Sequence, residues 1–380
     1  MKSAVFALGF YLIGALSLSA GETDSTEIMV TETKWDLDAL WRRAVLFESD
    51  DPSDLLQRLS VSGRIHYDYV NLHADVGDLD EWAFRRTRIG FLAKFRGHIS
   101  LRSEVTFEPN RADPFYLGLA NTYVQYDPTP DVSLRIGKQA PYFTLDGSES
   151  SNELLTLDRN LLSRNLWFVL GQIPGITLNL KNGPWSTGFG LFSGGSFSKE
   201  FGNFDGSLFG LVKEDYDLSE AWGVEEASLG LHYVYQDPDP LNTFTLPLEH
   251  IGSLNFRFHE GHWGFRSDLA GGKGALGQSD LGGFVLMPFY DLSDRLQIVT
   301  RYTWLESADP NGLRLNLYEF LSDRQRGDRL QEGYIGLNCF LHGHRLKWQN
   351  GLKYTHLADQ ARDGGAYDGW SYESGFRISW

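Results

Sequence analysis

The feature that most constrains this chain is an alternation of apolar and polar residues with a period of two. It begins near Leu59 and is clear in segments such as 59–69, 296–304 and 346–355. Successive side chains of a β-strand point to opposite faces, so each of these segments has one apolar and one polar face. After Ser19 no apolar stretch reaches the roughly 20 residues of a membrane-spanning helix. The pattern therefore predicts many strands, each lying between an apolar and an aqueous environment.

The connections between these strands alternate in length. Transmembrane barrels have short turns on one side of the membrane and long loops on the other, and they contain an even number of strands. Eight long and seven short connections give 16 strands, of which the strand near 207–216 alternates most weakly. We therefore predict an all-β fold, a transmembrane antiparallel β-barrel of 16 strands, over residues 57–380. The short connections lie at 96–98, 127–131, 181–184, 259–262, 292–294 and 342–344, with a longer acidic seventh at 217–226, and the long ones at 73–81, 108–115, 142–170, 196–206, 235–248, 272–280, 306–330 and 357–368.

The composition fits such a barrel but also fits a soluble all-β protein. Hydrophobic residues make up 42% of the chain and aromatic residues 14%, because only alternate residues of a barrel strand need to be apolar. Cys339 is the only cysteine, so no intramolecular disulfide can form. The formal net charge of −16 argues against nucleic acid as a partner.

The N-terminal part of the chain indicates export. Residues 1–20 have the pattern of a secretory signal peptide, with Lys2 before an uncharged apolar core and small residues after it, although the pattern does not fix the cleavage position. Residues 21–56 form an acidic segment that we place in the periplasm. Apolar residues at helical spacing between Trp35 and Phe47 favour a short helix there, and a disordered segment is the alternative.

The C-terminal residues point to the outer membrane. Phe376, Ile378 and Trp380 alternate with small or polar residues, and the chain ends on an aromatic side chain. This ending resembles the terminal strand that the barrel-assembly machinery recognises. We therefore expect that machinery to be a partner of the chain.

Several motifs resemble the phosphate-selective porin O and P family. They are Gly63–Asp68 in the first strand, Phe84–Phe91 with its double arginine, Phe95–Glu104, Leu134–Pro141 before the third loop, and Leu157–Asn160 at the end of that loop. The resemblance implies a homotrimeric 16-stranded porin whose third loop folds inward to narrow the pore. It also implies a basic lumen that selects anions, with phosphate as the solute of the best-known members.

The alternation assigns the charged residues of the strands to faces. The polar faces carry fourteen basic and six acidic positions, whereas the excess acid lies in loops and in residues 21–56. A positive aqueous lumen concentrates anions. The alternative is that these charges pair with one another, and a register error of one residue would turn a strand's charges outward. The residues expected to line the pore and contact anions are Arg64, Arg88, Lys94, Arg102, Arg135, Arg159, Arg257, Arg301 and Lys353.

The third loop carries charges of both signs. Its acids, such as Asp146, Glu149 and Asp158, face Arg159 and Arg164 in the sequence. If this loop narrows the pore, a transverse field would orient polar solutes. The alternative is that these charges hold the loop against the wall by salt bridges. Of this set we assign an anion-contacting role only to Arg159.

No motif for catalysis is present. The histidines lack helical metal-binding spacing, and neither a serine nucleophile motif nor a phosphate-cradling glycine loop occurs, so we expect no enzyme, no metal and no cofactor. We predict a passive diffusion channel for small hydrophilic solutes, integral to the outer membrane of a Gram-negative-type bacterium and in contact with its lipid and lipopolysaccharide. The channel favours anions, with phosphate or polyphosphate as specific candidates. The alternatives are an unselective or cation-tolerant general porin and a structural or enzymatic outer-membrane barrel.

Overall fold

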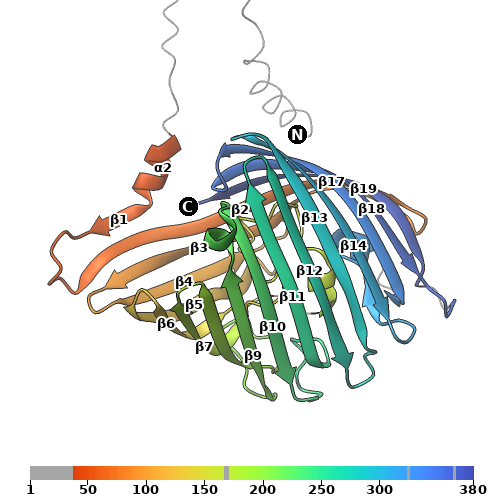
Figure 1. Cartoon of the computed structure of the whole chain (residues 1–380), viewed down its shortest axis with the longest axis horizontal. Coiled ribbons are helices and arrows are strands. Elements are labelled where there is room, and N and C mark those ends of the chain that lie inside the picture. Colours follow the sequence, from red (N-terminus) through yellow and green to blue (C-terminus); the bar gives the residue numbers. More distant parts are fainter. Residues whose placement is uncertain (1–36, 167–170, 323–325, 363–364) are drawn as a thin grey trace, which may run out of the picture. The chain divides into compact units, whose positions relative to one another are not determined.

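The computed structural model describes residues 37–166, 171–322, 326–362 and 365–380 (Figure 1). The predicted signal peptide at 1–20 lies outside the described residues. The described part begins with helix α2 (Leu37–Arg43) and strand β1 (Val45–Glu48). A short helix therefore lies in the acidic segment where the sequence favours one. Within the described ranges, no helix is both long enough and apolar enough to cross a bilayer.

Within the described residues, sixteen antiparallel strands form one closed sheet, and the short strand β1 pairs along β2 (Figure 1). Strands β2 to β14 pair in chain order, β14 pairs with β17, β17 to β19 again pair in order, and β19 pairs back with β2. The sheet of these described strands therefore has no free edge. A β-sheet in a lipid bilayer must close in this way, because its backbone N–H and C=O groups find no hydrogen-bond partners in lipid. The predicted 16-stranded barrel is confirmed, including the weak strand, which is β9. The strands are β2 (Leu56–Ala74), β3 (Gly77–Phe95), β4 (Ile99–Phe107), β5 (Tyr116–Thr129), β6 (Val132–Gln139), β7 (Ile173–Asn182), β8 (Trp185–Ser193), β9 (Leu208–Asp217), β10 (Glu226–Gln236), β11 (Leu248–Glu260), β12 (Trp263–Gly274), β13 (Leu281–Ser293), β14 (Leu296–Ser307), β17 (Arg329–His342), β18 (Leu346–Ala358) and β19 (Tyr367–Ser379).

The first hairpin differs from the prediction of a long loop at 73–81. Strands β2 and β3 pair as far as Ala74 and Gly77, which leaves a turn of two residues. Gly77 has a φ of 143°, a conformation that a residue with a Cβ rarely adopts. Leu72 and Leu79 lie opposite each other, so the ladder continues through this part of the sequence. The prediction was wrong because several aspartates give these strand ends the composition of a loop.

Strand β14 shows how the alternation is used. Its residues alternate between exposed and shielded positions, with Ile298 and Tyr302 on the exposed side. The alternate residues Arg301 and Thr303 are buried inside the barrel. The apolar face is thus available to lipid, and the polar face is turned inward.

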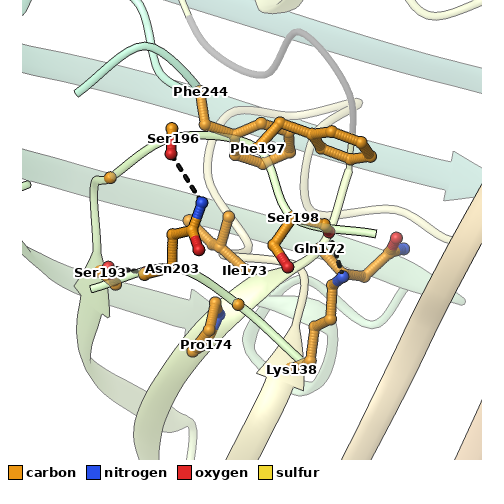
Figure 2. A pocket seen from close by; sticks show the side chains of 12 residues that line it. Lys138, Gln172, Ile173, Pro174, Ser193, Ser196, Phe197, Ser198, Asn203 and Phe244 are labelled. Atoms are coloured by element: carbon orange, nitrogen blue, oxygen red, sulfur yellow. Dashed lines mark hydrogen bonds between the residues drawn. The ribbon is translucent and has the colours of Figure 1, made fainter. Parts of the chain in front are cut away.

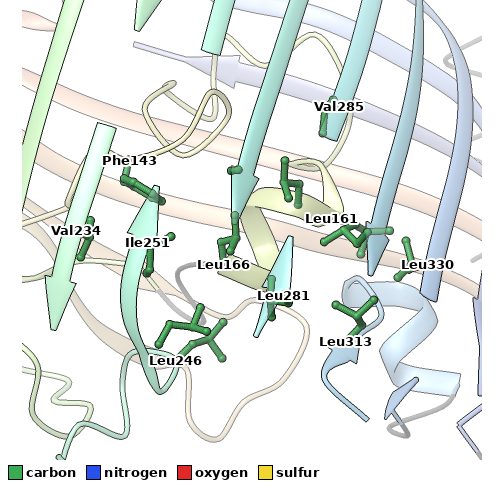
Figure 3. Packing of buried hydrophobic residues seen from close by; sticks show 14 of the residues in the cluster. Phe143, Leu161, Leu166, Val234, Leu246, Ile251, Leu281, Val285, Leu313 and Leu330 are labelled. Atoms are coloured by element: carbon green, nitrogen blue, oxygen red, sulfur yellow. The ribbon is translucent and has the colours of Figure 1, made fainter. Parts of the chain in front are cut away.

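Part of the barrel interior is an apolar core (Figure 3). Helix α3 (Leu161–Leu166) contacts β12, β13 and β14, and its leucines are buried in a cluster that includes Val285 and Leu305. Alternation alone predicts polar side chains at these inward positions. They are apolar because α3 covers them, and burial against α3 removes them from water as well as from lipid.

Residues 194–206 pack against β5 and the C-terminal end of β6, beyond which the chain no longer pairs with β5. Leu119 of β5 lies beyond the last β5–β6 pair, and its backbone N–H donates to the carbonyl of Lys199 over 2.7 Å. The Lys138 side chain is buried beneath this segment, and its ammonium donates to the Ser198 carbonyl over 2.9 Å (Figure 2). A lysine that alternation turns towards the outer face is therefore hydrogen-bonded to protein instead of facing lipid.

Strand β1 continues the hydrogen-bond ladder of β19 along β2. The chain ends at Trp380, whose backbone exchanges two hydrogen bonds with Gly63 over 2.9 and 3.0 Å. Just beyond, the Val61 N–H donates to the carbonyl of Ala44 over 2.8 Å, and β1 then pairs with residues 58–60. The N-terminal segment therefore supplies partners for the part of β2 that extends past the C-terminus.

Candidate pore-lining site

The largest cavity for which the structure gives a lining has a volume of about 680 Å³. It lies against the inner faces of β2 to β5 and against residues 140–164 and 171–172. Seven arginines and four carboxylates line it, so its surface is positive although the whole chain is negative. A positive surface in a confined aqueous space attracts anions more strongly than it would in bulk water. The arginines are Arg64, Arg85, Arg86, Arg88, Arg102, Arg159 and Arg164, and the carboxylates are those of Glu108, Glu149, Glu153 and Asp158.

A β-bulge in β3 places two consecutive arginines in this cavity. His66 pairs with Arg86 and Tyr67 pairs with Phe84, so Arg85 is the extra residue of the bulge. In a regular strand Arg85 and Arg86 would point to opposite faces, and one guanidinium would face lipid. The extra residue of the bulge allows both guanidinium groups to point into the cavity.

Glu104 neutralises part of the positive wall on β2 and β4. Its carboxylate lies 2.7 Å from the Arg102 guanidinium and 3.8 Å from that of Arg64. Arg64 also donates to the Ser151 hydroxyl over 2.8 Å, which ties β2 to the segment 140–166. Two predicted anion-contacting residues therefore line the cavity while sharing one carboxylate.

Arg85 forms the second link between the wall and residues 140–166. Its guanidinium lies 3.2 Å from the carboxylate of Asp158, which is buried. Burial alone would raise the pKa of Asp158, but the charges of Arg85 and Arg86 outweigh burial and hold this pKa well below its usual range. Asp158 therefore stays ionised and neutralises one arginine of the pair.

Arg86 and Arg88 differ from the other arginines of the wall. In the part of the chain that the structure describes, no carboxylate oxygen lies within 4.0 Å of either guanidinium. Arg88 also lies directly opposite Arg64 in the β2–β3 ladder. Like charges at directly opposed positions destabilise a sheet. Two cavity-lining guanidinium groups are thus available to a negatively charged solute.

Arg159 lines the cavity from the third loop, but much of its hydrogen-bonding capacity is used within that loop. Its Nε donates to the Asp146 carbonyl over 2.8 Å, and its Nη2 donates to the Glu149 carbonyl over 2.7 Å. Burial lowers the pKa of Arg159, and the carboxylates of Asp146 and Glu149 partly offset this effect. The guanidinium therefore shapes the loop as well as lining the cavity.

Three other predicted residues lie outside the cavity lining. Lys94 is exposed near the short turn at 96–98. Arg135 donates to the Gln125 side chain over 2.8 Å and lies over the Tyr123 ring, 4.2 Å from its centroid. Arg257 lies 3.4 Å from the carboxylate of Glu149.

The two remaining predicted residues are buried in ion pairs. The Arg301 guanidinium lies 2.8 Å from the carboxylate of Glu332 and also donates to the Thr156 hydroxyl over 2.7 Å. The ammonium of Lys353 pairs with Glu319 over 2.6 Å and also with Glu373. Alternation placed both side chains inward, but their contacts are with protein. Of the nine predicted residues, the structure thus gathers Arg64, Arg88, Arg102 and Arg159 around one cavity.

Arg85 is a cavity residue that alternation assigns to the wrong face. The signal was present in the sequence, because two adjacent arginines within a strand cannot alternate without turning one to lipid. The cost of an unpaired charge in hydrocarbon favours a local irregularity at such a pair. A bulge at 85–86 could therefore have been predicted from the doublet itself.

The sequence over the arginine-rich wall and the third loop identifies a family. Residues 59–206 match the sequence profile described as "Phosphate-selective porin O and P". This segment is similar to that family. The resemblance predicted from the motifs is thereby confirmed. No curated protein sequence is significantly similar to the chain.

Solved structures with the same fold include an anion-selective porin and an outer-membrane channel. The anion-selective porin from Comamonas acidovorans has a TM-score of 0.60 and 12% identity, with 85% of this chain and 99% of that chain covered. The outer-membrane channel DcaP of Acinetobacter baumannii has a TM-score of 0.56 and 13% identity, covering 88% and 99%. OprB of Pseudomonas putida, in its high-pH structure, has a TM-score of 0.60 and 8% identity, covering 85% and 94%.

These similarities, together with the family match, give the class of the protein. Identities of 8–13% show the fold, a closed barrel, and the match at 59–206 adds the porin family. The chain is an integral outer-membrane β-barrel and forms a channel. The predicted location is confirmed.

Proposed function

We propose that the chain is a passive channel for small hydrophilic solutes that favours anions. The observation that carries the proposal is the pair Arg86 and Arg88, two cavity-lining guanidinium groups with no carboxylate within 4.0 Å in the described ranges. Three of the four cavity carboxylates are already engaged, since Asp158 pairs with Arg85, Glu149 with Arg266 and Glu108 with Arg111. The uncompensated charge of the cavity is therefore positive.

Phosphate and polyphosphate are the specific solutes that we propose within this class. Guanidinium groups bind phosphate oxygens through paired hydrogen bonds, and adjacent arginines add their charges. Arg86 and Arg88 are separated by one residue on the same strand, and Arg64 lies opposite Arg88. We include Arg64, Arg102 and Arg159 as further anion contacts, because they line the same cavity.

We also propose that residues 140–166 form the constriction. Three inward-facing cations donate to backbone carbonyls of this segment: Lys347 to Leu154, Arg301 to Asp158 and Arg377 to Leu157. These hydrogen bonds come from β18, β14 and β19, so several strands hold the segment at once. A loop held in this way narrows the lumen on the side of β14, β18 and β19, and we propose the arginine-lined cavity as the passage.

The remaining proposals concern the setting of the channel. We propose that residues 1–20 are a signal peptide removed on export, that residues 21–56 are periplasmic, and that the channel is a homotrimer. Its partners are outer-membrane lipid, lipopolysaccharide and the barrel-assembly machinery, which would recognise the strand ending at Trp380. The exposed apolar face of the strands supports the lipid contact.

The sign of selectivity is tested by recording reversal potentials of the purified protein in planar bilayers under a potassium chloride gradient. We expect stepwise currents and a reversal potential displaced towards that of chloride. The double variant Arg86→Gln and Arg88→Gln should move the potential towards that of potassium, because it removes two uncompensated positive charges from the cavity lining. Lys94→Gln is the matched control, since it also removes a positive charge but lies outside the cavity.

A preference for potassium in the native channel would contradict the anion proposal and favour the general-porin alternative. A phosphate titration separates binding from charge bias. Block of the chloride current at millimolar phosphate, lost in the double variant, would support a phosphate site. Block that persists in the double variant would place the site elsewhere.

A further inference from the structure

Residues 313–320, between β14 and β17, form a second segment with side chains buried inside the barrel. They comprise β15 (Leu313–Arg314), which pairs with β16 (Arg326–Gly327), and the beginning of α5 (Leu317–Ser322). Leu313 and Leu315 are 0% and 1% exposed and belong to the same apolar cluster as the leucines of α3. The segment is therefore packed into the protein, unlike a solvated surface loop.

One side of this segment is bonded to the third loop. The Arg314 N–H donates to the side-chain oxygen of Asn165 over 2.9 Å, and the Asn165 amide donates back to the Arg314 carbonyl over 3.0 Å. The Asn316 amide donates to the Arg159 carbonyl over 3.5 Å, and Asn316 also lines the arginine-rich cavity. Residues 313–320 thus touch the loop that we propose as the constriction.

The other side of the segment is anchored to the wall. The Tyr318 hydroxyl donates to the carboxylate of Asp68 on β2 over 2.9 Å, and the Glu319 carboxylate lies 2.6 Å from the Lys353 ammonium on β18. Tyr318 and Glu319 are 4% and 1% exposed. In the sheet, β17, β18 and β19 lie between β14 and β2. A segment that leaves β14 and reaches β2 therefore crosses the inner side of three strands.

We infer that residues 313–320 are a brace that sets the bore of the channel, with Tyr318 and Glu319 as its positioning residues. The inference rests on the proposed channel function. The brace fills the side of the lumen between α3 and the strands β17 to β2, so solutes are confined to the cavity along β2 to β5. Release of the brace opens that side and frees one face of the third loop.

Substitution of the two anchors can be tested without dismantling the wall. Lys353 also pairs with Glu373, so Glu319→Gln leaves the buried ammonium with a carboxylate. Asp68 also pairs with Arg377, so Tyr318→Phe removes one hydroxyl from a carboxylate that keeps its charged partner. Both changes weaken the brace while preserving the ion pairs within the barrel wall.

The experiment is single-channel recording of both variants in planar bilayers, with polyethylene glycols of graded size to measure the bore. We expect steps of larger conductance to become about tenfold more frequent. Loss of one hydrogen bond to a charged group shifts the equilibrium between the anchored and the released brace by roughly this factor. Larger polymers should enter the pore, and the sign of the reversal potential should not change. Glu306→Gln is the matched control. Glu306 of β14 forms an exposed ion pair with Arg329 of β17, and these are the two strands that the segment 313–320 connects.

A native bore and native step frequencies in both folded variants would overturn the inference. Folding is checked by the heat-dependent shift of barrel proteins in detergent gels. If Glu319→Gln does not fold, the result for Tyr318→Phe decides. Absence of current steps from the native protein would instead contradict the channel proposal, so the two failures are distinguishable.

Discussion

Glu149 is the carboxylate whose removal should change both the anchoring of the third loop and the charge of the cavity. It accepts two hydrogen bonds from Arg266, over 2.7 and 2.8 Å, and one from Arg257 over 3.4 Å. The side chains of Glu149 and Arg266 are 7% and 12% exposed, so solvent screens their interaction only weakly. The variant Glu149→Gln removes the charge but keeps the size of the side chain and one acceptor oxygen.

The expected loss follows from the geometry of this pair. Two unit charges 4 Å apart attract by about 4 kcal/mol at an effective dielectric constant of about 20. Removing one partner of a buried ion pair costs roughly 3–5 kcal/mol, because the other charge is left without compensation. Glutamine retains a hydrogen bond to Arg266, so we expect a loss of about 3 kcal/mol, or about 100-fold in the equilibrium between anchored and released loop.

Two measurements in planar bilayers test this expectation. The reversal potential under a salt gradient should move further towards that of chloride, because a negative charge is removed from the cavity lining. Fluctuations of the open-channel current should increase as the loop loses an anchor. The matched control is Glu249→Gln, whose ion pair with Lys273 is more exposed and lies outside the cavity. A shift towards potassium, or fluctuations equal to those of the control, would refute the reasoning.

Two further predictions concern stability. Trp41→Ala removes a hydrogen bond of 2.7 Å to the Ser379 carbonyl and a stacking contact with His342, and should cost about 3 kcal/mol. It should therefore speed heat unfolding in detergent gels without changing conductance. An unchanged unfolding rate would show that the contacts of α2 with β17 and β19 do not stabilise the barrel. Burial, followed by the charge of Lys347, lowers the pKa of His344 from 6.5 to about 4. The unfolded chain therefore binds a proton at a higher pH than the folded chain does. As a result, the free energy of unfolding falls as the pH drops from about 6.5 to about 4. His344→Gln should reduce the fall in unfolding temperature between about pH 7 and pH 4.5, and an equal fall in both proteins would contradict this assignment.

The alternation of residue types carries enough information to predict the barrel. A transmembrane strand must expose apolar side chains to lipid, so residues such as Ile298 and Tyr302 identify their face without knowledge of any neighbour. The even strand count then determined that the weakly alternating segment at 207–216 is a strand, and the structure has β9 there. These predictions succeed because the membrane imposes the same constraint on every strand.

Alternation fails where the environment of a face changes along the chain. Val285 and Leu305 face inward but are apolar, because α3 shields them from water. The hairpin at β2 and β3 continues past its apolar zone, where aspartates are tolerated in strands and mimic a loop. The bulge at Arg85 shifts the phase of one strand by one residue. In each case the deciding contact is with a segment distant in sequence or depends on local geometry, which a period of two cannot express.

The same limit explains why a count of inward-facing basic residues overstates the charge available to solutes. Lys347, Arg301 and Arg377 face inward as alternation requires, but each donates to a backbone carbonyl of residues 154–158. Those carbonyls belong to a loop segment that has left the wall, so strand pairing cannot satisfy them, and cations from the wall supply the donors. Arg86 and Arg88 lie on the side of the barrel where the cavity replaces such contacts. Selectivity should therefore follow the few arginines that face open space, and substitutions among the buried cations should change stability before they change the reversal potential.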